Sequence, residues 1–84
     1  MRTKVARQAR RHKVGNAHML FVMSTVEPTR GTRPNGETEL TWTGTDDRDI
    51  ELEITAVVTT DDRRGDPIIL IIHCMPTALR RAER

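Results

Sequence analysis

Hydrophobic and polar residues alternate over two stretches in the middle of the chain. Leucine and tryptophan alternate with threonines near residue 40, which predicts a strand over residues 38–44. Residues 50–59 alternate in the same way, with aliphatic side chains at every second position and the carboxylates of Glu51 and Glu53 between them. A strand of this kind packs one face on the core and leaves the other in solvent.

A third strand is predicted over residues 67–75, where the run PIILIIHCM is almost wholly apolar. Pro76 ends this run, and the basic residues 77–84 form a short helix or a tail. Glycine, proline, asparagine and threonine collect in residues 29–38, which we interpret as a loop, and polar turns precede the second and third strands.

The N-terminal third of the chain favours helix. Residues 3–13 contain alanine, arginine, glutamine and lysine, which are good helix formers, and Gly15 has the character of a helix C-cap. A second helix is predicted over residues 17–25, with a core face formed by Leu20, Met23 and Phe21. This helix is apolar nearly all round, which argues against a DNA-reading helix-turn-helix, whose second helix carries a polar reading face.

The order helix, helix, strand, strand, strand, short helix predicts an α+β fold. Sequential strands with short connections form an antiparallel meander, so we expect an N-terminal helical hairpin on a three-stranded antiparallel sheet, followed by a short basic helix or tail. At 84 residues the chain has room for one modest core, so residues 1–84 are interpreted as a single domain.

The longest apolar stretch in the N-terminal part, residues 19–23, is too short for a signal peptide or a membrane span. The single cysteine, Cys74, cannot form an internal disulfide and lies in an apolar strand, where it is expected in the core with Met75. We therefore expect a cytoplasmic protein without membrane contact. A partner subunit would add stability to a core of this size.

Charge is distributed unevenly along the chain. The first thirteen residues carry six bases and no acid, the last eight have a net charge of +2, and the middle has a net charge of −6. Basic segments attract polyanions, and the two ends form one patch if Arg10 or Arg11 lies near Arg80 or Arg81. A solvated helix face is the alternative. The candidate RNA-binding residues are Arg10, Arg11, His12, Lys13, Arg48 and Arg81.

No phosphate-binding loop, dinucleotide fingerprint or zinc-spaced set of ligands is visible, so neither a cofactor nor a metal is expected. The sequence does offer the groups that cleave RNA through its own 2′-hydroxyl: a base, an acid and cations for the phosphate. The candidates are Glu53 as the base, His73 as the acid and Arg80 as the catalytic cation, assisted by Arg48 and Arg81. The ordinary alternative is an exposed glutamate and a hydrogen-bonded histidine. Without tyrosine, RNA contacts would depend on charge rather than stacking.

Three segments together resemble the BrnT-like ribonuclease toxins of bacterial type II toxin–antitoxin pairs. RRHKVGNAHMLFVM is similar to their "KHGVSxEEAxxVF" helix-turn-helix segment, and TWTGTDDRDIELEITAV resembles their "ITIGxSxxGRxLxVV" strands. IILIIHCMPTALRRAER resembles their last strand and arginine-rich end, particularly as found in small actinobacterial relatives.

The resemblance implies a RelE-like fold, metal-independent endoribonuclease activity and a cognate antitoxin protein, with family roles on Arg80, Arg81 and the region of Arg48. Two departures stand out: the family's strand before the first helix is missing from the predicted elements, and the family's Gly-Arg at the strand hairpin is replaced by Arg48-Asp49. The alternative is a non-catalytic nucleic-acid or protein binding module of the same fold. A homodimer and a toxin–antitoxin hetero-oligomer both remain open.

Overall fold

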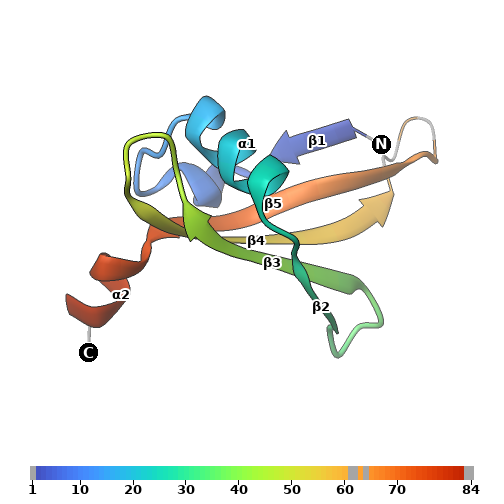
Figure 1. Ribbon diagram of the computed structural model, residues 1–84. Coiled ribbons are helices and arrows are strands. Elements are labelled where there is room, and N and C mark those ends of the chain that lie inside the picture. The colour runs from blue at the N-terminus through green and yellow to red at the C-terminus, as the bar shows by residue number, and fades with distance from the viewer. Residues whose placement is uncertain (1, 61–62, 64, 83–84) are drawn as a thin grey trace.

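A five-stranded mixed sheet forms the centre of the chain (Figure 1). The computed structural model describes residues 2–60, 63 and 65–82, with the side chains of residues 80–82 excepted. The elements in chain order are β1 (Arg2–Val5), the 3-10 helix η1 (Arg7–Arg10), α1 (Asn16–Thr25), β2 (Thr29–Thr32), β3 (Thr38–Thr45), β4 (Glu51–Thr60), β5 (Pro67–Pro76) and α2 (Thr77–Ala82).

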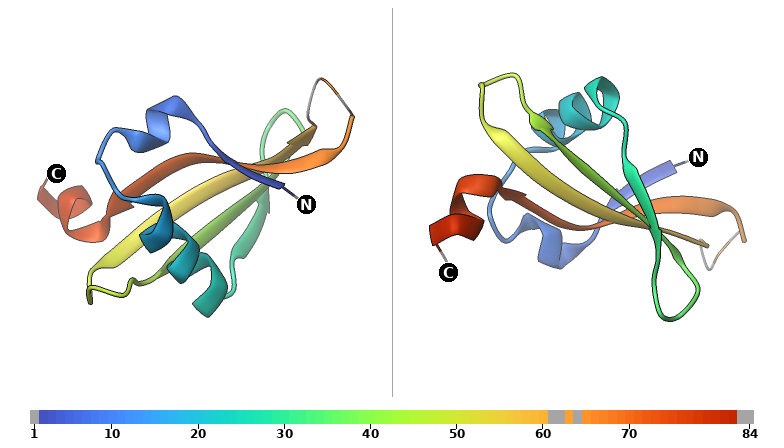
Figure 2. Two further views of the ribbon diagram at one scale, coloured as in Figure 1. Left: turned by 90° about the horizontal axis from the view of Figure 1, so that it is seen from above. Right: turned by 60° about the horizontal axis from the view of Figure 1, so that its bottom comes forward.

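The strands lie in the order β1-β5-β4-β3-β2. From β2 to β5 each strand is antiparallel to the next, whereas β1 is parallel to β5. Figures 1 and 2 show α1 across one face of this sheet and α2 on the other side, at the end where β5 finishes. We call the face opposite α1 the open face. No helix in the described part of the chain is long and apolar enough to cross a lipid bilayer.

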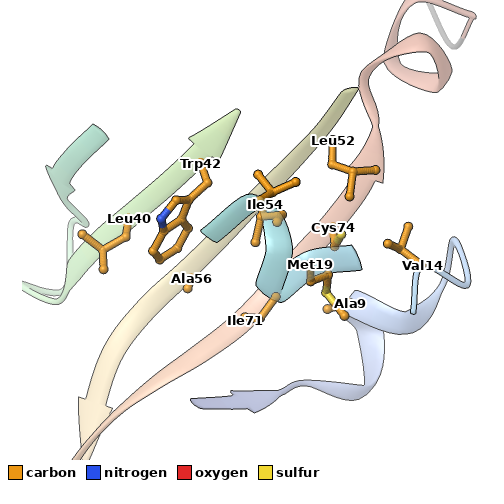
Figure 3. Close-up of a cluster of buried hydrophobic side chains, with 11 residues drawn as sticks. Ala9, Val14, Met19, Leu40, Trp42, Leu52, Ile54, Ala56, Ile71 and Cys74 are labelled. Carbon is orange, nitrogen blue, oxygen red and sulfur yellow. The ribbon is translucent and has the colours of Figure 1, made fainter. Parts of the chain in front are cut away.

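The core lies between α1 and the sheet (Figure 3). Met19 and Val22 of α1 are fully buried, and they pack over a layer of sheet residues that includes Trp42, Ile54, Ala56, Ile71 and Cys74. The alternating positions of β3 and β4 meet in this layer because Trp42 pairs with Ile54 and Leu40 pairs with Ala56. The predicted inward positions of Trp42 and Cys74 are confirmed, since both side chains are buried in this layer. Met75 is buried as predicted, but it pairs with Glu53 and therefore lies on the opposite face of the sheet.

Gly44 allows α1 to approach β3 closely. A Cβ atom at this position would lie 2.9 Å from Cγ1 of Val26 and 3.3 Å from Cγ1 of Val22. The contact with Val26 is too short for a Cβ atom and the contact with Val22 is tight, so the absence of a side chain at Gly44 lets the C-terminal end of α1 lie close to the sheet.

The predicted helical hairpin on a three-stranded antiparallel sheet is wrong, because residues 3–13 do not form one helix. Arg2–Val5 is a strand paired with β5, and only Arg7–Arg10 is helical. Helix propensity is a weak local preference, and pairing with the long apolar β5 overrides it. The chain then turns at Lys13, whose φ of 56° is left-handed, while the expected C-cap residue Gly15 instead precedes α1 as its N-cap.

Two further expectations for this region need correction. The helix over residues 17–25 is confirmed as Asn16–Thr25, and Met23 packs against the core as expected, but the fully buried residues are Met19 and Val22, while Leu20 and Phe21 are exposed. A helix that is apolar nearly all round carries no periodic signal from which its buried face can be read. The segment interpreted as a loop contains β2, a short edge strand whose residues are all exposed and therefore lack any hydrophobic pattern.

Candidate functional site

Glu53 and His73 lie on the open face, on adjacent strands. Thr55 pairs with His73, and Glu53 pairs with Met75, so the carboxylate and the imidazole belong to diagonal neighbours. Such neighbours are roughly 7–8 Å apart, within reach of long side chains. The structure therefore brings the predicted base and the predicted acid to the same surface.

A β-bulge in β5 is responsible for this arrangement. Ala56 pairs with Ile71 and Thr55 pairs with His73, so Ile72 is an extra residue without an opposing partner on β4. Strict alternation would place His73 on the same face as Ile71, beneath α1. The bulge shifts the alternation by one residue, which turns His73 to the open face and Cys74 into the core.

The imidazole of His73 is only partly accessible. The residue is half-buried, as expected for a strand that is about to leave the sheet. Its Nε2 atom, however, is buried and has no hydrogen-bond partner among the described residues. Leaving a buried polar atom without a partner costs about 1–3 kcal/mol, so this nitrogen is a site at which a hydrogen-bonding group of a ligand would be stabilised.

Arg48 lies in the β3–β4 turn and is engaged by Asp46. Its Nε and an Nη donate to one carboxylate oxygen of Asp46 at 3.0 and 2.7 Å, and the backbone N–H groups of Arg48 and Ile50 donate to the other at 2.8 and 3.0 Å. Burial raises the pKa of Asp46, but the hydrogen bonds and the charge of Arg48 outweigh burial and leave this pKa below its ordinary value. Arg48 therefore has a structural task at this turn besides any contact with phosphate.

The lowered pKa of Asp46 predicts a stability that declines in acid. Because the folded-state pKa lies below the unfolded one, the contribution of Asp46 is complete above the unfolded value and is lost as pH falls through the folded value. We expect the melting temperature of Asp46→Asn to fall less between neutral pH and pH ~3 than that of the parent. Asp49→Asn is the matched control, since Asp49 has a left-handed φ of 66° that asparagine tolerates. Parallel pH profiles for the parent and Asp46→Asn would contradict this account.

His18 joins α1 to the same turn. Its Nδ1 lies 2.5 Å from Oδ1 of Asp47, and the nearest ligand atoms of His18, Asp46 and Asp47 all lie within 4.8 Å of one another. This geometry could in principle hold a metal ion. Both oxygens of Asp46 already accept hydrogen bonds, however: Oδ2 from the Arg48 guanidinium and Oδ1 from two backbone N–H groups. The positive charge of the guanidinium also opposes a bound cation. We interpret the contact between His18 and Asp47 as a polar link that fixes the turn to α1. Sequence reasoning missed it because 29 residues separate its partners.

The predicted N-terminal phosphate contacts lie in η1 and the turn after it. Arg10, Arg11 and Lys13 are exposed and His12 is half-buried, and Nη1 of Arg10 donates to Oδ1 of Asn16 at 3.3 Å. Arg80 and Arg81 belong to α2, but their side chains, and with them the expected proximity of the two basic ends, lie outside the described part of the structure. Figure 1 shows η1 and α2 toward the same end of the sheet but on opposite sides of it.

Cys74 belongs to the core rather than to a site. Its side chain is buried beneath α1, and burial raises the pKa of the thiol to about 11. The thiol is therefore protonated and unreactive at neutral pH.

Comparison with known proteins identifies no relative of this chain. A scan against protein-family models, a search of curated proteins and a search of solved structures each return no match.

Proposed function

We propose that the protein is the toxin of a type II toxin–antitoxin pair, a metal-independent endoribonuclease that a cognate antitoxin neutralises in the cytoplasm. The observation that carries this proposal is the β5 bulge, which turns His73 to the face that displays Glu53. The same end of the sheet continues into α2, which carries Arg80 and Arg81. The proposed base and acid thus share one face of the sheet, and the strand that carries the acid continues into the helix whose sequence contains the cations.

The proposed reaction needs only these groups. Glu53 accepts the proton of the RNA 2′-hydroxyl, whose oxygen attacks the adjacent phosphorus, and His73 protonates the 5′-oxygen that leaves. The products are a 2′,3′-cyclic phosphate and a 5′-hydroxyl, and Arg80 stabilises the charge that builds on the phosphate. Because Nε2 of His73 is buried in the structure, donation from this atom requires the ring to turn outward when RNA binds.

The N-terminal strand removes one objection to the BrnT-like resemblance. The elements predicted from sequence lacked the strand that precedes the first helix in that family, but Arg2–Val5 forms such a strand, followed by η1 and α1. The second departure, Arg48-Asp49 at the hairpin, remains. The arrangement of the chain therefore supports the toxin proposal without identifying the family.

One observation favours a second function, a non-catalytic RNA or protein binding module. The buried Nε2 of His73 has no partner among the described residues, whereas a general acid must reach its substrate. In this alternative, the open face binds without turnover and His73 only anchors a ligand.

The two functions differ in what happens to RNA. We expect induced expression of the chain alone to stop growth and fragment cellular RNA, and co-expression with an antitoxin encoded by a neighbouring reading frame to restore both. The purified protein should cleave RNA in the presence of a chelator, because no metal takes part. Binding without cleavage under every salt condition would favour the binding module, and the absence of both would refute the two proposals together.

The arginines of α2 predict a salt-dependent contribution to RNA binding. Arg80→Ala with Arg81→Ala should weaken binding and toxicity, because the protein then neutralises fewer phosphates and releases fewer counterions from the RNA. The slope of log affinity against log salt should become shallower by about 0.7 for each phosphate of single-stranded RNA that is no longer neutralised. The control is Arg30→Ala with Arg33→Ala, a pair located at the β2–β3 hairpin. Equal effects from both pairs would indicate attraction by overall charge rather than a clamp at α2.

A further inference from the structure

Thr55 lies between Glu53 and His73 on the open face. It pairs directly with His73 across β4 and β5, and it follows Glu53 by two residues on the same face of β4. Directly paired side chains have Cβ atoms about 4.5–5.5 Å apart, and residues two positions apart along a strand are separated by about 7 Å. A group bound between the predicted base and the predicted acid therefore lies over Thr55.

The hydroxyl of Thr55 is available to such a group. The residue is half-buried, and its hydroxyl makes no hydrogen bond to another residue in the described part of the chain. In the right-hand view of Figure 2, β4 runs in front with no described helix over its middle. A threonine hydroxyl has one proton to donate and rotates to suit its acceptor, so Thr55 can donate to a ligand on this face.

The composition of the central strands determines which donors a ligand meets there. β3, β4 and β5 contain no lysine or arginine, so the side-chain donors that they direct to the open face are hydroxyls and the imidazole of His73. A phosphate that reaches both Glu53 and His73 loses water from its oxygens and needs donors in exchange. Of the hydroxyls that the described strands place on this face, only that of Thr55 neighbours both residues, because Thr43 pairs with Glu53 on the side away from β5.

We propose that Thr55 is a further catalytic residue, whose hydroxyl donates a hydrogen bond to a non-bridging oxygen of the scissile phosphate; this inference rests on the ribonuclease function proposed above. Negative charge builds on the non-bridging oxygens when the 2′-oxygen attacks, so the hydrogen bond strengthens as the transition state forms. Thr55 keeps its proton throughout, while Glu53 and His73 carry out the two proton transfers. The hydroxyl also orients the phosphate between these two groups.

The test compares Thr55→Val with the parent in cleavage of a defined RNA in the presence of a chelator. Valine is favoured in strands, so the substitution removes the hydroxyl while the chain stays folded. We expect kcat to fall by about 10–10²-fold with little change in KM, because the lost hydrogen bond acts mainly on the charge of the transition state. Thr55→Ser keeps a hydroxyl and should restore most of kcat. Thr59→Val is the matched control, since Thr59 is half-buried on the same face of β4 but pairs with Ile68, away from His73.

A sulfur substitution in the RNA separates contact with the phosphate from a structural role of Thr55. Sulfur is a weaker hydrogen-bond acceptor than oxygen, so replacing one non-bridging oxygen of the scissile phosphate weakens the hydrogen bonds to that atom. One of the two diastereomers should slow the parent more than it slows Thr55→Val, because the variant has no hydrogen bond to lose there. A purely structural effect of Thr55→Val would leave the sulfur effect of each diastereomer the same in the parent and the variant.

Binding of uridine 2′,3′-cyclic phosphate, which has the product chemistry of the proposed reaction, gives a readout that does not depend on turnover. We expect the amide resonance of Thr55 to shift on binding, and Thr55→Val but not Thr59→Val to weaken the affinity by about 3–10-fold. If the parent binds this nucleotide in that way without cleaving RNA, the proposed reaction is wrong and the phosphate contact of Thr55 stands.

Three results would overturn the inference while leaving the ribonuclease function intact: a parent-like kcat for Thr55→Val, an equal loss for Thr59→Val, or sulfur effects that are the same in the parent and in Thr55→Val. A folded parent that neither cleaves RNA nor binds the cyclic nucleotide would overturn the inference and the ribonuclease function together.

Discussion

Replacing His73 by alanine or Glu53 by glutamine should lower the rate of RNA cleavage by about 10²–10⁴-fold while RNA still binds. Proton transfer lowers the barrier of the chemical step, whereas affinity for RNA depends mainly on cations near the phosphates. Neither substitution removes a cation that is permanently charged. The measurement is cleavage of a defined RNA without metal, alongside retention of the same RNA on a filter.

Each variant has a matched control in the chain. Glu39→Gln is the control for Glu53→Gln. Glu39 also lies on the open face, because it pairs with Val57. It is near the start of β3, however, whereas the residue of β3 that pairs with Glu53 is Thr43, near the other end of that strand. His18→Ala removes an imidazole that contacts Asp47 rather than the open face. Both controls should retain cleavage after their folding has been verified. Unchanged cleavage by Glu53→Gln and His73→Ala would refute the site assignment even if the parent is a ribonuclease.

The central strands could be predicted because alternation is a strong local signal. Strands over residues 38–44 and 50–59 agree with β3 and β4 to within one residue at each end, since their apolar side chains recur at every second position. The strand over residues 67–75 agrees equally well with β5, but it was predicted from a continuous apolar run. β1 carries no comparable signal. Its residues are basic and mostly exposed, and only its position beside β5 makes Arg2–Val5 a strand. β1 and β5 are more than sixty residues apart in the sequence, and local composition does not reveal that two such distant segments pair.

The candidate site depends on an irregularity that alternation cannot predict. Residue types alone identified Glu53 and His73, but the face to which His73 points follows from the single extra residue in β5. A one-residue shift moves every later side chain of a strand to the other face. The Asp46–Arg48 contact also changes the interpretation of Arg48, because the predicted phosphate ligand forms an ion pair that stabilises the β3–β4 turn. That contact has the local Asx-turn chemistry that the run DDRD permits.

Ile54→Ala should destabilise the protein by about 2–5 kcal/mol, close to the whole stability of a core of this size. The side chain of Ile54 is fully buried between Trp42 and Cys74, its partners on β3 and β5, so its removal leaves a cavity where α1 meets the sheet. Ile50→Ala makes the same change on a side chain that is 38% exposed, and it should cost no more than about 0.5 kcal/mol.

The measurement for this pair is urea denaturation followed by the fluorescence of Trp42, the single tryptophan of the chain, which is buried in the folded state. We expect Ile54→Ala to be partly unfolded without denaturant and to regain structure in a stabilising salt such as sulfate, which strengthens apolar burial. Ile50→Ala should unfold at nearly the parent midpoint. Similar midpoints for the two variants would mean that α1 does not pack on the β4 face that contains Ile54, and the description of the open face as the opposite surface would then be wrong as well.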